Sequence, residues 1–201
     1  MRFLRPLPLH LSLHSALSCS MPRFDLLARL AAHTAWDATE SEMLRRTWLF
    51  AVNEPHCLDP EHPPGHITGS AWVLDPAGTS VLLTHHRKLD RWLQLGGHVD
   101  PGETVLKAAL REAEEESGIP GIRPIRSAVF DVDVHEIPAR GPRPAHFHYD
   151  VRFVLRAERR APVASSESRD LRWVPIADVA AWNPAPSVVR MVEKTLRMRK
   201  I

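Results

Sequence analysis

The stretch that decides the fold runs from Gly97 to Ile119 and reads GHVDPGETVLKAALREAEEESGI. Its second half predicts a helix at about 104–117. Thr104 has a side-chain oxygen that can cap the first turn, and Gly118 can take the left-handed conformation that ends many helices. A glycine-rich loop followed by a capped helix is therefore the feature around which the rest of the chain is interpreted.

Three carboxylates share one face of this predicted helix. Glu112, Glu115 and Glu116 are spaced at i, i+3 and i+4, and the same face continues the small apolar residues of the segment 105–109. Like charges at this spacing repel, and anions in the last turn face the negative end of the helix dipole, at roughly 0.3–1 kcal/mol each. A bound Mg²⁺ or Mn²⁺ with oxygen ligands would offset that repulsion. A solvated acidic helix end is the alternative interpretation.

At these residues the chain resembles the Nudix hydrolases. Their signature, the Nudix box, is a glycine, five residues, a glutamate, seven residues, and then Arg-Glu-aliphatic-x-Glu-Glu-x-Gly-aliphatic. Here the matching positions are Gly97, Glu103 and the run REAEEESGI at 111–119. Every fixed position matches, although Ala113 is smaller than the usual aliphatic residue.

The resemblance implies a fold. We expect an α/β/α sandwich around a mixed β-sheet, formed by residues 64–201, with the box helix packed on the sheet. A helical extension followed by a proline-rich loop would occupy residues 21–63. The segment 1–20 has two arginines, no acids, and leucines broken by prolines and histidines. We expect it to be a disordered or non-native leader.

The resemblance also implies an activity, the hydrolysis of the diphosphate linkage in a nucleoside diphosphate linked to another moiety. Glu112, Glu115 and Glu116 would hold Mg²⁺ or Mn²⁺, which neutralises the diphosphate and activates water. Glu115 is the first choice for the base that takes the proton from that water. Glu115, Glu112 and Arg111 form the set of catalytic candidates.

The loop before the helix supplies further candidates. Gly96 and Gly97 have no Cβ, so their backbone can approach a metal ion or a phosphate closely. Glu103 can bond back to the loop or to Arg111, and a structural role in holding the loop on the helix is favoured for this pair. His98 can contact metal-bound water, although a lone histidine is more often an ordinary loop residue.

Two segments after the helix alternate polar and apolar residues, which predicts a pair of strands. A symmetric hairpin would place His135 opposite His148 and Asp133 opposite Asp150. Two acids opposed across a sheet repel, so this polar cluster could line a substrate cleft or bind a further cation, with an exposed sheet face as an equal alternative. Glu167, in the loop that follows, is a weaker candidate for an extra metal-binding or catalytic glutamate.

The N-terminal extension predicts two helices within residues 22–54. The segment 39–42, Thr-Glu-Ser-Glu, has the form of a capping box at the start of the second. A packing extension is favoured over a lid or a partner surface.

Composition excludes several classes of protein. The chain is 44% hydrophobic and 25% charged, and its net charge of +2 comes without a long basic run, so duplex nucleic acid is not an expected partner. No apolar run is long enough to cross a membrane. Two cysteines, Cys19 and Cys57, argue against a disulfide framework and fit a reducing cytoplasm. The expected partner is a small nucleoside diphosphate derivative.

Two other function classes stay open. An enzyme similar to isopentenyl diphosphate isomerase would use the same fold, but it needs a catalytic cysteine in a defined motif that Cys57 lacks. A non-catalytic nucleotide-binding sensor is the other class. Loss of the box glutamates would favour it, whereas all of them are present here. Sequence marks typical of ADP-ribose and NADH enzymes are missing, so the sequence favours no single substrate, and it predicts no oligomeric state.

Overall fold

The computed structural model describes residues 13–163, 165–166 and 168–198, with side chains from Met21 onward. The helices are α1 (Leu13–Ala31), α2 (Ala38–Asn53), α3 (Val105–Ser117), α4 (Val179–Trp182) and α5 (Pro186–Met198), with a 3-10 turn at Ile176–Asp178. The strands are β1 (Gly65–Leu74), β2 (Ser80–His86), β3 (Arg91–Leu93), β4 (Leu95–His98), β5 (Arg123–Pro124), β6 (Asp131–Ile137), β7 (His146–Arg156) and β8 (Ser168–Pro175).

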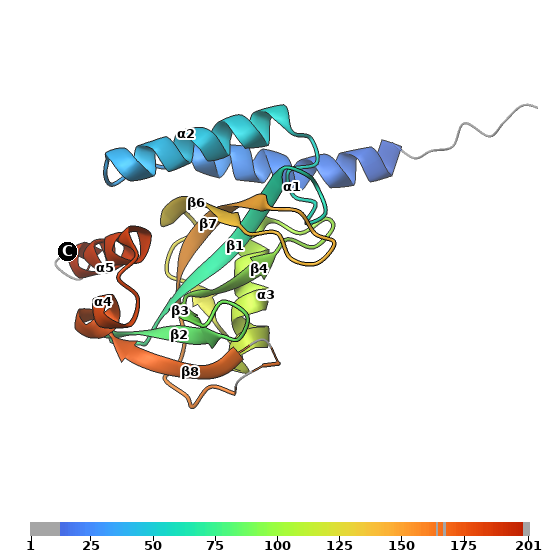
Figure 1. Ribbon diagram of the computed structural model, residues 1–201. Coiled ribbons are helices and arrows are strands. Elements are labelled where there is room, and N and C mark those ends of the chain that lie inside the picture. The colour runs from blue at the N-terminus through green and yellow to red at the C-terminus, as the bar shows by residue number, and fades with distance from the viewer. Residues whose placement is uncertain (1–12, 164, 167, 199–201) are drawn as a thin grey trace, which may run out of the picture.

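One mixed sheet joins these eight strands, and β1 lies at its centre. β1 pairs with β7 in parallel along its whole length and with β2 and β4 in antiparallel fashion. The parallel pair brings together segments about eighty residues apart, with His66 beside His148 and Thr68 beside Asp150. The mixed sheet expected from the sequence is confirmed (Figure 1).

The two faces of β1 meet different layers because neighbouring side chains on a strand point to opposite sides. Ile67 and Ala71 belong to a core cluster that includes buried residues of α1, α2 and α3. Trp72 and Leu74 belong to a second cluster that includes Val188 and other residues of α5. Helices therefore cover both sides of the sheet, which confirms the predicted α/β/α sandwich (Figure 1).

The box helix begins and ends where the sequence predicts. The Thr104 side chain accepts a hydrogen bond from the backbone N–H of Lys107, and Gly118 takes the left-handed conformation with φ 64°. Its buried face includes Val105, Ala108 and Ala109, which have no exposed surface. These small side chains let α3 approach β1 and β4 closely.

The N-terminal helices pack on the domain. α1 takes in residues 13–20, which the sequence analysis placed in the leader; residues 1–12 lie outside the described part of the chain. α2 is capped by Asp37, two residues before the predicted cap Thr39, because Asp37 adopts the extended conformation and its side chain accepts from the N–H of Glu40. Phe50 of α2 stacks on Tyr149 of β7 with ring centroids 4.0 Å apart, so α2 packs against the sheet.

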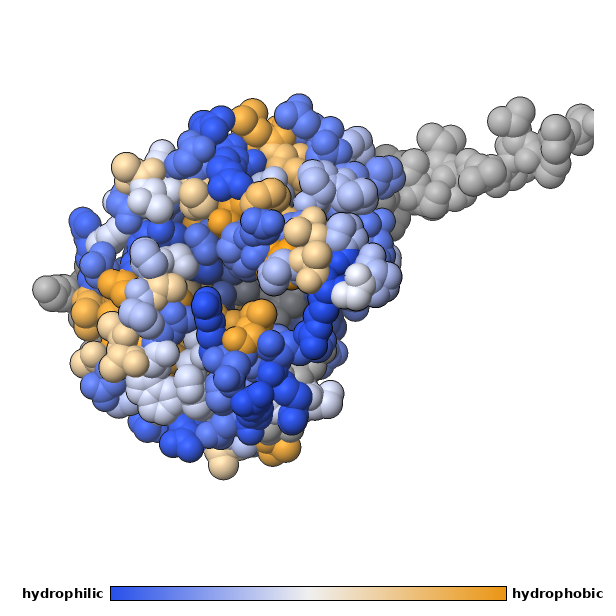
Figure 2. Space-filling model, viewed as in Figure 1, coloured by the Kyte–Doolittle hydropathy of each residue, from blue (hydrophilic) through white to orange (hydrophobic). Residues whose placement is uncertain are grey.

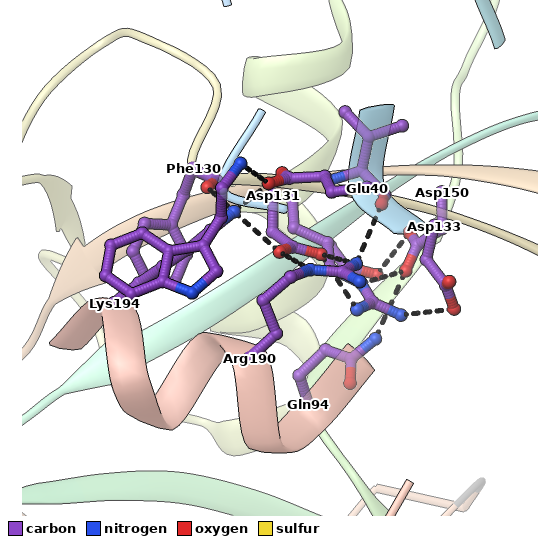
Figure 3. A network of polar contacts seen from close by, with 12 residues as sticks. Glu40, Gln94, Phe130, Asp131, Asp133, Asp150, Arg190 and Lys194 are labelled. Atoms are coloured by element: carbon purple, nitrogen blue, oxygen red, sulfur yellow. Dashed lines mark hydrogen bonds and ion pairs between the residues drawn. The ribbon is translucent and has the colours of Figure 1, made fainter. Parts of the chain in front are cut away.

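A buried ionic network joins α2, β6 and α5 (Figure 3). Lys194 Nζ lies 2.6 Å from Glu40 Oε1 and 2.7 Å from Asp131 Oδ2, and Arg190 donates two hydrogen bonds to Asp131. Burial alone would raise the pKa of Glu40, but hydrogen bonds from His33 and Lys194 lower it to about 2. Removing one partner of such a network leaves a buried charge uncompensated, which costs about 3–5 kcal/mol.

Within the described part of the chain, no helix is both long and apolar enough to span a membrane. The face seen in Figure 2 is mainly hydrophilic, with hydrophobic side chains in separate patches.

Candidate active site

The loop and the helix of the Nudix box meet where Gly97 lies against Glu112. A Cβ added to Gly97 would stand 2.5 Å from both Cδ and Oε1 of Glu112. The missing side chain of Gly97 thus lets β4 approach this carboxylate of α3 without displacing it. Gly96 is needed for a different reason. Its φ of 149° disfavours any other residue, and an added Cβ would clash with Ser70 and with the Gly69 carbonyl of β1.

The three glutamates differ in exposure. Glu116 is buried, with 7% of its surface exposed. The side chain of Glu112 is 19% exposed, and that of Glu115 is 62% exposed. The acidic face therefore runs from the sheet out to solvent, as the continuation of the apolar stripe predicts for Glu112 and Glu116. Glu115 extends from that face into solvent.

Arg111 ties the loop to the helix. Its Nη2 lies 3.0 Å from Glu103 Oε2 and donates to the carbonyl of His98 at 3.0 Å, while Nη1 lies 2.9 Å from Glu112 Oε1 and 3.2 Å from Glu115 Oε2. Burial opposes the charge on Arg111, but the hydrogen bonds to Glu103 and Glu112 raise its pKa above the usual range. The predicted contact between Glu103 and Arg111 is present.

Glu103 also holds the loop itself. Its Oε2 accepts from the N–H of Asp100 at 3.2 Å, and its own N–H donates to the Asp100 carbonyl. Both partners that the sequence offered for Glu103, the loop and Arg111, are therefore used together.

This donor set fits Mg²⁺ or Mn²⁺. Carboxylate oxygens are the ligands that these hard cations prefer. Glu112, Glu115 and Glu116 come from adjacent turns of one helix, and the missing Cβ of Gly97 leaves room for the Glu112 carboxylate beside the loop. The donor type suits the ion, and the assignment of Glu112, Glu115 and Glu116 as its ligands stays a prediction.

The strand pair after the helix has the predicted register. His135 lies opposite His148 and Asp133 opposite Asp150. The repulsion expected between the two acids is resolved by Arg152, whose Nη2 lies 3.1 Å from Asp133 and whose Nε lies 2.8 Å from Asp150. Burial would raise the pKa of Asp133, but the neighbouring His135 ring and the charge of Arg152 hold it well below its usual range.

Asp150 is engaged on both of its oxygens. Oδ1 accepts from Ser70 at 2.7 Å and Thr68 at 3.0 Å, and Oδ2 accepts from Gln94 at 3.2 Å as well as from Arg152. As a result the two aspartates act as partners of an arginine, and the histidines are the part of the predicted cluster that could bind a metal ion.

Glu167, the weaker candidate for an extra metal-binding or catalytic glutamate, lies outside the described residues.

Sequence reasoning missed two histidines of this region. His66 of β1 and His146 of β7 lie beside His148, and the ligand nitrogens of all three fall within 4.8 Å of one another. His146 lies two residues before His148 on the same side of β7, and His66 joins them through the parallel pairing of β1 with β7. The alternating pattern of β1 places His66, Thr68 and Ser70 on one side of that strand, but it does not indicate that β7 is the neighbouring strand.

Two other features lie apart from the glutamates. Cys57 is fully buried, and burial raises the pKa of its thiol to about 11, so it lacks the thiolate character of a nucleophile.

A cavity of about 640 Å³ opens elsewhere, between α1, the 126–130 segment and the end of α5. Its lining contains none of the box residues, so the pocket volume does not locate the predicted chemistry.

Comparison with known proteins agrees with this geometry. The sequence profile of the NUDIX domain matches residues 65–193. The bis(5'-nucleosyl)-tetraphosphatase [asymmetrical] of Rattus norvegicus is 32% identical over 87 residues, covering 40% of this chain and 59% of that protein. The putative 8-oxo-dGTP diphosphatase 3 of Mycobacterium tuberculosis is 32% identical over 111 residues, covering 52% and 49% respectively. The chain thus spans about half the length of these curated relatives.

Solved structures share the fold. The C. elegans Ap4A hydrolase binary complex has a TM-score of 0.54 at 19% identity, covering 66% of this chain and 96% of that one. The NUDIX domain of Shewanella oneidensis NrtR, complexed with ADP ribose, has a TM-score of 0.50 at 20% identity, covering 76% and 97% respectively. Since the NUDIX profile matches more than half of the sequence and the box residues lie together on α3 and its loop, this chain belongs to the Nudix hydrolase family.

Proposed function

We propose that the protein is a metal-dependent pyrophosphohydrolase that cleaves the diphosphate linkage of a nucleoside diphosphate linked to another moiety. The observation that carries this proposal is the complete acid set of α3, in which the Glu112 carboxylate lies where a Cβ at position 97 would be 2.5 Å away. Cys57 is a free, buried thiol, which is consistent with the reducing cytoplasmic setting that we propose for this enzyme.

Glu112, Glu115 and Glu116 are the residues that would hold Mg²⁺ or Mn²⁺. When bound, such an ion neutralises the diphosphate and lowers the pKa of a coordinated water. Arg111 holds Glu112 and Glu115 in position through contacts of 2.9 and 3.2 Å. Its further contacts with Glu103 and the His98 carbonyl keep the loop against the helix, so that the ligand geometry is fixed before substrate binds.

Glu115 is the residue best placed to act as the base. Its side chain is 62% exposed, whereas Glu116 is buried. An exposed carboxylate can take a proton from the attacking water and pass it on to solvent. Attack of that water at one phosphorus releases two phosphorylated products.

The substrate is proposed to be a compound in which a phosphate anhydride is attached to a nucleoside. The rat relative acts, by its name, on bis(5'-nucleosyl) tetraphosphates, and the mycobacterial relative is named as a putative 8-oxo-dGTP diphosphatase. Both names describe nucleosides with phosphoanhydride chains. Dinucleoside polyphosphates and nucleoside triphosphates are therefore the first compounds to test.

A substrate screen tests the proposal. The purified protein is incubated with nucleoside triphosphates, nucleotide sugars, ADP-ribose, dinucleoside polyphosphates and coenzyme A in Mg²⁺, in Mn²⁺ and in chelator, and the products are identified by mass spectrometry. We expect at least one compound to yield two phosphorylated products in the presence of metal only. Turnover that persists in chelator, or tight binding of a nucleotide with no turnover of any compound, would refute it.

A further inference from the structure

Several histidines gather on the face of the sheet opposite α3. His66 on β1 lies beside His148 on β7, and His146 precedes it on the same side of β7. The ring centroid of His66 lies 4.7 Å from that of His148 and 5.4 Å from that of His146, and the ring of His98 lies 4.9 Å away. Such a concentration of imidazole rings at the end of two central strands calls for a chemical explanation.

His66 is the least expected member of the group. It has no exposed surface, and among the described residues neither Nδ1 nor Nε2 of His66 has a hydrogen-bond partner. A buried polar group without a partner costs about 1–3 kcal/mol. An apolar side chain at this position would avoid that cost, so the two ring nitrogens indicate a ligand that is bound some of the time.

We propose that His66, His146 and His148 form a binding site for a transition-metal ion of the Zn²⁺ class, separate from the site of the glutamates. Three imidazole nitrogens are a ligand set that suits Zn²⁺ and its neighbours in the first transition row. The proposal does not depend on the activity of the glutamates, because the histidines come from other strands and another face of the sheet.

The spacing of the ligand atoms is compatible with coordination. They lie within 4.8 Å of one another. With Zn–N bonds of 2.0–2.1 Å, nitrogens at the corners of a tetrahedron are about 3.3 Å apart. Metal binding would draw the three nitrogens together by up to about 1.5 Å. Three protein ligands leave the fourth corner open for water or for an oxygen of another molecule.

The contacts around the rings prepare the ligand nitrogens. His146 Nδ1 lies 3.0 Å from the carbonyl oxygen of Pro144 and donates to it, so Nε2 is the nitrogen left to bind a metal ion. A histidine ligand that donates its other ring N–H to a backbone carbonyl is a recurring arrangement in metal sites, because it fixes both tautomer and ring orientation.

The aspartates of the same strand pair do not complete the ligand set. Asp133 on β6 and Asp150 on β7 are both engaged by Arg152. The ligands of the proposed site are therefore the three imidazoles, which bind a metal ion in their neutral form.

The two sites are distinguished by side of the sheet and by ligand type. Gly97 of β4 faces Glu112 on the α3 side, whereas the His98 ring, one residue later, lies against His66 on the other side. The glutamates offer only hard oxygen donors and the histidines only nitrogen donors. Excess Mg²⁺ should therefore fill the first site and leave the second to Zn²⁺.

The test is a Zn²⁺ titration of metal-free protein in excess Mg²⁺, followed by competition with a chromogenic chelator. We expect one Zn²⁺ per chain. His66→Gln and His148→Gln should each weaken binding by about 100-fold or more, since even the loss of an outer partner of a ligand costs 10–100-fold. His135→Gln, a matched substitution on the neighbouring strand, should leave the affinity within about threefold.

The glutamate set provides a second control. The triple variant Glu112→Gln, Glu115→Gln, Glu116→Gln should retain Zn²⁺ binding, which separates this proposal from the hydrolase proposal. X-ray absorption of the Zn²⁺-loaded wild type supplies a readout that needs no variant. We expect a first shell with three imidazoles. Binding unchanged in both histidine variants, binding lost in the glutamate variant, a shell without imidazole, or no uptake in excess Mg²⁺ would each overturn it.

Discussion

Replacing Gly97 by alanine tests how closely the loop must approach the catalytic helix. The new Cβ would lie 2.5 Å from Cδ and Oε1 of Glu112 and 2.9 Å from Oε2, whereas ordinary contact begins near 3.4 Å. The Glu112 carboxylate must therefore shift by about 1 Å. A misplacement of that size can reduce turnover about 100-fold, which corresponds to a barrier increase of about 2.7 kcal/mol.

The stability of the Gly97→Ala variant should change little. Gly97 is not among the glycines with positive φ, so alanine can adopt its backbone conformation. The Glu112 side chain is 19% exposed and can move aside, so the free energy of unfolding should change by no more than about 1 kcal/mol. The predicted signature is a lost rate in a folded protein.

The assay combines steady-state turnover, on the substrate that the screen identifies, with urea unfolding. Gly141→Ala is the matched control, because Gly141 has φ 57° and no atom within 4 Å of an added Cβ. It should lose about 1–2 kcal/mol of stability through its left-handed conformation and keep its turnover. Wild-type turnover in Gly97→Ala, at unchanged stability, would refute the account of the loop.

Three further predictions concern single side chains. Glu115→Gln and Glu116→Gln should each reduce turnover by orders of magnitude in a folded protein, whereas Glu114→Gln on the same helix should not, because Glu114 only accepts hydrogen bonds from the 121–122 backbone. Glu40→Gln should cost about 3 kcal/mol at pH 7, since the Glu40 pKa falls from 4.5 to about 2 on folding. Cys57→Ala should leave turnover per folded molecule unchanged, because the thiol is buried and its pKa is raised to about 11.

The sign of the pH effect follows from the lowered pKa of Glu40. Its contribution is complete above pH 4.5 and is lost as the pH falls through about 2, so the stability difference between wild type and Glu40→Gln should shrink over that interval. Urea unfolding at a series of pH values measures it, and a constant difference would contradict the assignment. Near-normal turnover in both Glu115→Gln and Glu116→Gln would contradict the assignment of these glutamates to the active site. A turnover loss in Cys57→Ala would reopen the isomerase alternative.

The box helix was predictable because its determinants are local. Thr104 caps it, Gly118 ends it, and the spacing of Glu112 and Glu116 follows directly from helical periodicity. The opposition of Asp133 and Asp150 was also predictable, since a symmetric hairpin fixes the register. These features depend on short stretches of the chain, in which propensity, periodicity and turn positions agree.

Long-range contacts were not predictable. Nothing in the local pattern of β1 indicates that His66 lies beside His148, because this depends on a parallel pairing between distant segments. Asp131 belongs to an alternating strand, yet it has no exposed surface, because Arg190 and Lys194 reach it from the last helix. Charged residues far apart in sequence can be paired only when the fold is known.

The most direct test of the central claim is Mn²⁺ uptake, followed by electron paramagnetic resonance, in the wild type and in the triple variant Glu112→Gln, Glu115→Gln, Glu116→Gln. The His66→Gln variant serves as a control for the histidine site. If the helical glutamates hold the catalytic cation, the triple variant should lose the Mn²⁺ site that the wild type and His66→Gln retain. Equal Mn²⁺ uptake by the wild type and the triple variant would contradict the account.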